Sequence, residues 1–136
     1  MSRGLKRMIP PERSTNAAAA EFFITLLHAA TSGHVLHLQT RSYAQHKTLD
    51  EFYSELPSLV DEVIESYQGK YGLVMDYPSG YSVPTTAPID FVSALSDYVT
   101  STRASVAADS ELQNLIDEIQ QLIDSTLYKL RFLRSE

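Results

Sequence analysis

The feature that most constrains the fold is an amphipathic pattern in the C-terminal part of the chain. In "ELQNLIDEIQQLIDSTLYKLRFLR", apolar residues recur at steps of three and four, so they lie on one face of a helix. That face comprises Leu112, Leu115, Ile116, Ile119, Leu122, Ile123, Leu127, Leu130 and Leu133. Acidic residues come early in this stretch and basic residues come late, as the helix dipole favours. The pattern predicts a long helix that buries its apolar face against other helices.

Three earlier segments also carry helical patterns. The first, from about residue 16 to 40, begins with the strong helix formers of "AAAAE". The second extends from about 42 to 69 and includes Pro57, which removes a backbone hydrogen bond and clashes with the preceding turn. We therefore expect a kink or a break near Glu55. The third, from about 88 to 106, begins with a proline, which suits the first helical position.

A long connection is predicted between the second and third helices. The stretch from Gly69 to Pro88 carries Gly, Pro and Tyr without a sustained period. A short strand in "YGLVMDY" is an alternative, although it would have no partner strand. Four helices with one long crossover favour an all-α fold, a ferritin-like four-helix bundle. We expect this bundle in residues 16–136 and a basic, flexible tail in residues 1–15.

The composition argues against several classes of protein. With 136 residues, of which 43% are hydrophobic, the chain can bury one core and forms one domain. The absence of Cys excludes a disulfide framework and a thiolate metal site, and it favours a reducing, cytoplasmic location. No signal-peptide pattern and no apolar run of about 18 residues occurs, so we expect no membrane contact.

The formal net charge of -6 argues against a nucleic-acid-binding body, because phosphate contacts need a concentrated positive surface. One local exception is the N-terminal tail, which gathers Arg3, Lys6, Arg7 and Arg13. Four cations would support only weak, salt-sensitive DNA binding. A tail that merely solubilises the protein is the alternative.

A set of histidines and carboxylates lies at regular spacings in the second quarter of the chain. The set is His34, His37, His46, Asp50, Asp61 and Glu65. His46 with Asp50, and Asp61 with Glu65, are pairs four residues apart, so each pair shares one face of a helix. Carboxylates with one or two imidazoles suit iron or manganese better than copper, and the lack of thiolate disfavours a structural zinc site. The alternative is a set of ordinary polar residues on exposed helix faces.

One chain cannot bring both pairs to the same metal. Along a continuous helix, Asp50 and Asp61 are separated by roughly 16 Å, far beyond one coordination sphere. Two copies packed antiparallel about a twofold axis would place His46 and Asp50 of one copy against Asp61 and Glu65 of the other. If these residues are ligands, the spacing predicts a homo-oligomer with metal centres at its helix–helix interfaces.

The spacing "H…12…HxxxD…11…DxxxE" resembles the ligand pattern of the Dps-type, DNA-protecting miniferritins of the ferritin-like superfamily. Tyr53 fits the "HxxFDxxY" run of that family, and "STLYKLRFLRS" is similar to its last helix. The segment "HLQTRSYAQHKTLDEFY…VDEVIESYQGKYG" is also similar to uncharacterised small proteins encoded by tailed bacteriophages.

The miniferritin resemblance implies a ferroxidase. Its ligands would be His34, His46, Asp50, Asp61 and Glu65, with His37 as an alternative to His34. It implies that Fe(II) is bound between subunits and oxidised by peroxide or dioxygen, for iron sequestration and oxidative protection. Manganese or zinc could substitute for iron, and twelve subunits would form a hollow shell.

Two departures from the family favour a different function. Family members carry Trp directly after the first histidine, whereas this chain has no Trp, and Pro57 lies between the two ligand pairs. The alternative function is a non-catalytic helical interaction protein, encoded by a phage and acting on a host partner. For His28, which lies outside the pattern, we expect a hydrogen-bonded core position.

Overall fold

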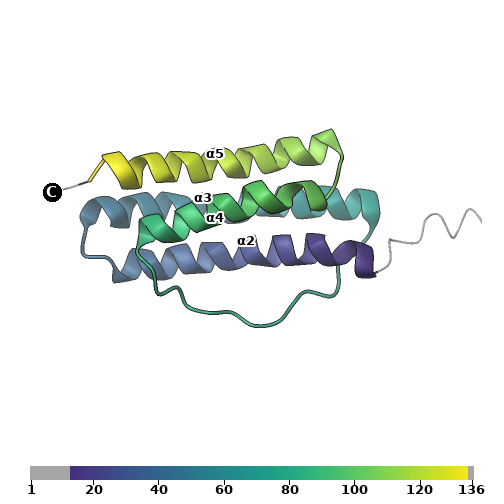
Figure 1. The fold of residues 1–136 in the computed structure, drawn as a ribbon, viewed down its shortest axis with the longest axis horizontal. Helices are drawn as coiled ribbons and strands as arrows, with labels where there is room; N and C mark the ends of the chain where they lie inside the picture. Colours follow the sequence, from purple (N-terminus) through teal and green to yellow (C-terminus); the bar gives the residue numbers. More distant parts are fainter. Residues whose placement is uncertain (1–12, 135–136) are drawn as a thin grey trace, which may run out of the picture.

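The computed structural model describes residues 13–134 and contains four α-helices (Figure 1). They are α2 (Arg13–Gln39), α3 (Tyr43–Tyr71), α4 (Pro88–Thr102) and α5 (Ser110–Phe132), and a short 3-10 helix, η1 (Arg103–Ser105), follows α4. No strand occurs in this part of the chain, so the all-α class is confirmed and the alternative of a short strand is wrong. Among the described helices, none has the length and hydropathy that crossing a bilayer requires.

The predicted N-terminal tail lies almost entirely outside the described residues. Residues 1–12 include three of its four cations and the positions to which weak DNA binding was assigned, so those expectations stay predictions. The first helix begins at Arg13, slightly earlier than the predicted start near residue 16.

The helices pack side by side, and a long link joins the second to the third (Figure 1). Helices α2 and α3 form an antiparallel hairpin, and the link, residues 72–87, then passes beside α2 to the opposite end of the bundle. Helix α4 therefore begins at the end where α3 begins, and α5 returns antiparallel to α4. The main contacts join α2 to α3, α3 to α5, and α4 to α5, whereas α2 and α4 touch sparsely.

Helix α3 is continuous through Pro57, so the predicted break near Glu55 does not occur. An interior proline costs about 3 kcal/mol of helix stability, but packing of the buried face can exceed this cost. Leu56 and Val60, on either side of the proline, are fully buried in the core. Their burial anchors α3 in the core on both sides of the proline, where α3 packs against α2 and α5.

The core lies along the centre of the bundle and uses the apolar face predicted for the last helix. Its largest fully buried side chains from the other helices include Phe22, Phe23, Leu26, Phe52 and Leu56. From α5 come Leu112, Ile116, Ile119, Ile123, Leu127 and Leu130. Leu133, at the end of the predicted stripe, is instead 49% exposed, because it follows the last residue of α5.

Candidate functional site

Two of the predicted ligands, His37 and His46, face each other across the turn between α2 and α3. Their rings stack with centroids 3.7 Å apart and an interplanar angle of 18°. The Nδ1 atom of His37 lies 2.8 Å from the carbonyl oxygen of His46, and Nδ1 of His46 lies 2.9 Å from the carbonyl oxygen of His37. Because a carbonyl only accepts, each Nδ1 carries its proton and donates it.

These reciprocal hydrogen bonds have a structural role. The carbonyl of His37 lies in the last turn of α2, where carbonyl groups have no partner within the helix. His46 satisfies that carbonyl from the second helix, while Ser42 caps the beginning of α3 by accepting from the backbone N–H of Gln45. The two histidines therefore hold the end of α2 against the beginning of α3. The prediction of a metal site did not include this structural role.

The other predicted ligands near this turn have different partners. His34 is exposed, and its ring stacks on Tyr53 with centroids 4.1 Å apart. Burial and a hydrogen bond with Asp50 raise the pKa of the Tyr53 hydroxyl. His34 and Asp50 thus both contact Tyr53, and they do not point together at a position that a metal ion could occupy.

The second pair, Asp61 and Glu65, is exposed on the far half of α3. Among residues 13–134, no three His, Asp or Glu side chains come together in a way that could hold a metal ion. The structure therefore does not assemble the predicted ligands within one chain, as their spacing required. A site shared between two copies stays a prediction.

A polar cluster around Asp109 lies at the opposite end of the hairpin, where α3 ends. The Tyr71 hydroxyl donates to Asp109, and Lys70 forms ion pairs with Asp109 at 3.3 Å and with Glu111 at 3.1 Å. The hydrogen bond from Tyr71 and the nearby ammonium of Lys70 lower the pKa of the Asp109 carboxyl. The same hydrogen bond, with burial, raises the pKa of the Tyr71 hydroxyl. The cluster joins α3 to the beginning of α5.

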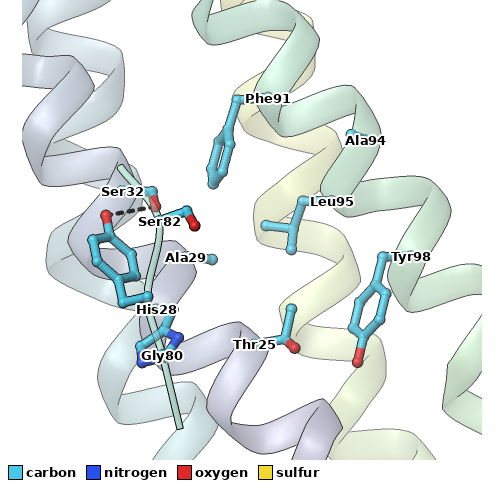
Figure 2. Close-up of a pocket in the computed structure, with 11 residues that line it drawn as sticks. Thr25, His28, Ala29, Ser32, Gly80, Ser82, Phe91, Ala94, Leu95 and Tyr98 are labelled. Atoms are coloured by element: carbon cyan, nitrogen blue, oxygen red, sulfur yellow. Dashed lines mark hydrogen bonds between the residues drawn. The ribbon is translucent and has the colours of Figure 1, made fainter. Parts of the chain in front are cut away.

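A pocket of about 350 Å³ opens between α2, α4 and the middle of the link (Figure 2). It is lined by Thr25, His28, Ala29 and Ser32 of α2, by Phe91, Ala94, Leu95 and Tyr98 of α4, and by Gly80, Tyr81 and Ser82 of the link. The pocket exists because α2 and α4 touch sparsely and because several facing side chains are small. Figure 2 shows the rings of Phe91 and Tyr98 extending from α4 beside this space.

The link closes one side of the pocket through Tyr81. Its hydroxyl lies 2.9 Å from the hydroxyl oxygen of Ser32, and its ring meets that of His28 edge to face at 5.0 Å. Gly80 has a φ of 99°, which side chains rarely adopt, so a glycine allows the link to turn just before Tyr81. His28 thus lines a pocket, in contrast to the hydrogen-bonded core position predicted for it. The sequence indicated only a long connection that carries Gly, Pro and Tyr, and it did not predict a pocket there.

Comparison with known proteins gives two matches. The Family of unknown function (DUF5856) matches residues 37–130. The chain is also 31% identical over 121 residues to the "Uncharacterized 14.6 kDa protein in mobD-ri intergenic region" of Enterobacteria phage T4. That alignment covers 87% of this chain and 92% of the phage protein. No solved structure matches the chain.

These matches overturn the assignment to Dps-type miniferritins, because the chain matches a family of unknown function and an uncharacterised phage protein, and neither is described as ferritin-like or Dps-type. The similarity to an uncharacterised phage protein agrees with the other resemblance drawn from the sequence. The physical reason for the error is that pairs such as His46–Asp50 and Asp61–Glu65 also arise on ordinary amphipathic helices. Without a matching solved structure, the ferritin-like assignment of the bundle is not confirmed.

Proposed function

The chain belongs to the Family of unknown function (DUF5856), and on that premise we propose its function from the geometry of its own pocket. The protein is a non-catalytic helical protein that binds a small, uncharged aromatic molecule between α2, α4 and the link. The sequence predicted a non-catalytic helical interaction protein as an alternative, and this proposal adds a ligand to that role. A bound ligand would fix the positions of the link and α4, and thereby the surface that they offer to a partner.

The observation that carries the proposal is the chemistry of the pocket lining. Aromatic rings from Phe91, Tyr98, Tyr81 and His28 line it, and no Asp, Glu, Lys or Arg does. A charged group buried there would lose its hydration without gaining an ionic partner, which costs several kcal/mol. A volume of about 350 Å³ lies within the usual range of small-molecule sites, which are mostly apolar with a few polar groups. A flat, neutral ring can pack against such walls.

Three polar side chains can orient a ligand in this pocket. Thr25, His28 and Tyr98 line it, and none of their side chains makes a hydrogen bond to another residue of the described chain. The ring of Tyr98 is held in place by stacking on Phe22, with centroids 6.1 Å apart. A ligand with one N–H or O–H group would therefore find acceptors at fixed positions without disturbing the core.

We expect indole to bind this pocket in a nuclear magnetic resonance titration of the ¹⁵N-labelled protein. The amide shifts should concentrate on residues 25–32, 80–82 and 91–98, and indole-3-acetate should bind more than about tenfold more weakly, because no Lys or Arg lines the pocket to compensate the desolvation of its carboxylate. Replacing Ala94, an exposed residue at the pocket, by Phe should fill the space and abolish the shifts.

The matched control is Ala18→Phe, which adds the same ring to an exposed position on α2 outside the pocket. Indole binding should persist in this variant. Shifts that are scattered over the surface, or that survive Ala94→Phe unchanged, would contradict the proposed function.

One observation favours a second candidate, oxidation of Fe(II) at an interface between two copies. Because Nδ1 of His37 and of His46 donates to a carbonyl, the other ring nitrogen of each neutral imidazole carries a free electron pair. Metal-ligating histidines are commonly held in this way. This candidate needs Asp61 and Glu65 from a second copy, so self-association and the ferritin-like topology are proposed only together with it.

The iron candidate is tested by adding Fe(II) anaerobically to metal-free protein and then admitting peroxide. If the protein binds a ligand in its pocket and does not oxidise iron, the rise of ferric absorbance in the near ultraviolet will match that of a protein-free blank. Oxidation faster than the blank, saturating at a fixed ratio of metal to subunit, would favour the second candidate. Asp61→Ala should then abolish it without loss of folding, because Asp61 is exposed.

A further inference from the structure

One end of the bundle combines three segments that are far apart in the sequence. Figure 1 shows that α2 ends, α3 begins and α5 ends at the same end of the molecule. An ion pair between Lys129 Nζ and Glu51 Oε1, at 2.6 Å, joins α5 to α3 there. Residues 38–47 and 128–134 are thereby gathered at one surface.

Residues 38–47 and 128–134 carry positive charge, although the whole chain carries a net charge of -6 and the first turn of α4, which begins at the same end, contains Asp90. Residues 38–47 and 128–134 contain no Asp or Glu. Their exposed cations are Arg41, Lys47, Arg131 and Arg134. Within residues 13–134 none of these four takes part in an ion pair, in contrast to Lys129. The net charge of the whole chain therefore hides a local concentration of positive charge.

Three aromatic rings are exposed on the same surface. Tyr43 is 71% exposed, Tyr128 is 54% exposed and Phe132 is 71% exposed. Tyr128 and Phe132 lie one turn apart on α5, with ring centroids 6.0 Å apart. Large aromatic side chains are normally buried in a helical bundle, so packing within this chain does not explain their exposure. We call these three rings and the four unpaired cations the basic end.

We propose that the basic end binds single-stranded nucleic acid without sequence preference. Cations that pair with phosphates, next to flat rings on which unstacked bases can lie, are the two elements of such binding. A duplex would not use the rings, because its bases are already stacked. Leu38 and Leu133 are also exposed here, so an acidic protein is the other conceivable occupant. Four unpaired cations on two segments that contain no Asp or Glu favour the polyanion.

The test uses the full chain and a fluorescently labelled fifteen-nucleotide oligo(dT), with binding followed by fluorescence anisotropy. We expect binding at 50 mM salt that weakens about 50-fold at 200 mM, because four phosphate contacts on a single strand give a slope of about 2.8 in the logarithmic salt dependence. Phe132→Ala should weaken binding at least about fivefold by removing a stacking ring. Arg131→Gln with Arg134→Gln should reduce the salt slope by about 1.4.

Two control variants keep the test specific. Lys70→Gln removes a cation at the other end of α3, and Leu73→Ala removes an exposed apolar side chain of the link. Both should bind the oligonucleotide as the parent does. Because all of the substituted residues are at least partly exposed, circular dichroism should show unchanged folding.

Three outcomes would overturn the proposal. The first is an absence of binding at 50 mM salt. The second is equal competition by poly-glutamate, which would assign the surface to an acidic protein. The third is binding that survives the Phe132 and Arg131/Arg134 variants but disappears when Arg3, Lys6 and Arg7 are replaced by Gln. That result would place nucleic-acid binding in the N-terminal segment.

Discussion

Replacing His46 by Ala should lower the free energy of unfolding by about 2 kcal/mol, measured by urea denaturation. The substitution removes the hydrogen bond that satisfies the carbonyl of His37 in the last turn of α2, and it removes the ring that stacks on His37. It also leaves the His37 ring, which is 8% exposed in the parent, open to water. His46→Asn should recover about 1 kcal/mol of this loss, because an Asn amide can donate from nearly the position of Nδ1.

A double-mutant cycle tests whether His37 and His46 act as a pair. Each substitution by Ala removes the same stacking contact, so the double variant should lose about 1 kcal/mol less than the sum of the single losses. His34→Ala is the control, since His34 is exposed and lies outside the pair; it should cost no more than about 0.5 kcal/mol. Additive losses at His37 and His46 would show that the two rings do not depend on each other.

Replacing Gly33 by Ala should lower the free energy of unfolding by about 1 to 2 kcal/mol, although Ala is the better helix former. A Cβ atom at Gly33 would lie 2.8 Å from Cδ2 of Phe52 and 3.0 Å from its Cε2. The Phe52 ring is completely buried, so it cannot move aside without disturbing the core between α2 and α3. The free-energy cost of this crowding therefore exceeds the stabilisation that Ala provides through its higher helix propensity, which is at most about 1 kcal/mol. The measurement is the urea midpoint at an unchanged m-value.

Gly69 provides a matched control for this substitution. It also lies within a helix, near the end of α3, but a Cβ there would meet nothing within 4 Å. Gly69→Ala should therefore stabilise the protein by up to about 1 kcal/mol, the opposite sign from Gly33→Ala. If both variants shifted the midpoint in the same direction, the close approach of α2 to α3 would not be the cause.

The positions of the helices could be predicted because helical periodicity is a local property of the sequence. The apolar stripe of α5 identified a helix that is present from Ser110 to Phe132. The predicted alternative of a break at Pro57 was wrong, because a local rule on proline cannot include the burial of Leu56 and Val60 on both sides of it.

The candidate site was less predictable, because a spacing pattern does not tell which atoms a side chain will contact. The stretch from His34 to Tyr53 does bring the rings of His37, His46 and Tyr53 together. However, the Nδ1 atoms of His37 and His46 bond to backbone carbonyls, and His34 stacks on a tyrosine. The pocket beside His28 had almost no sequence signal, since its walls come from α2, α4 and the link.

The sequence by itself determined that residues 13–134 are all-α and contain four α-helices, since the spacing of apolar residues within each segment is enough to require a helix. Only the tertiary structure decided where the pocket and the basic end, the two proposed binding surfaces, lie. The pocket depends on how far α2 lies from α4 and on where the link crosses them. The basic end depends on the turn between α2 and α3 lying at the same end of the bundle as the end of α5, although these segments are about ninety residues apart in the chain. Such contacts arise from the packing of whole helices, which no local pattern contains.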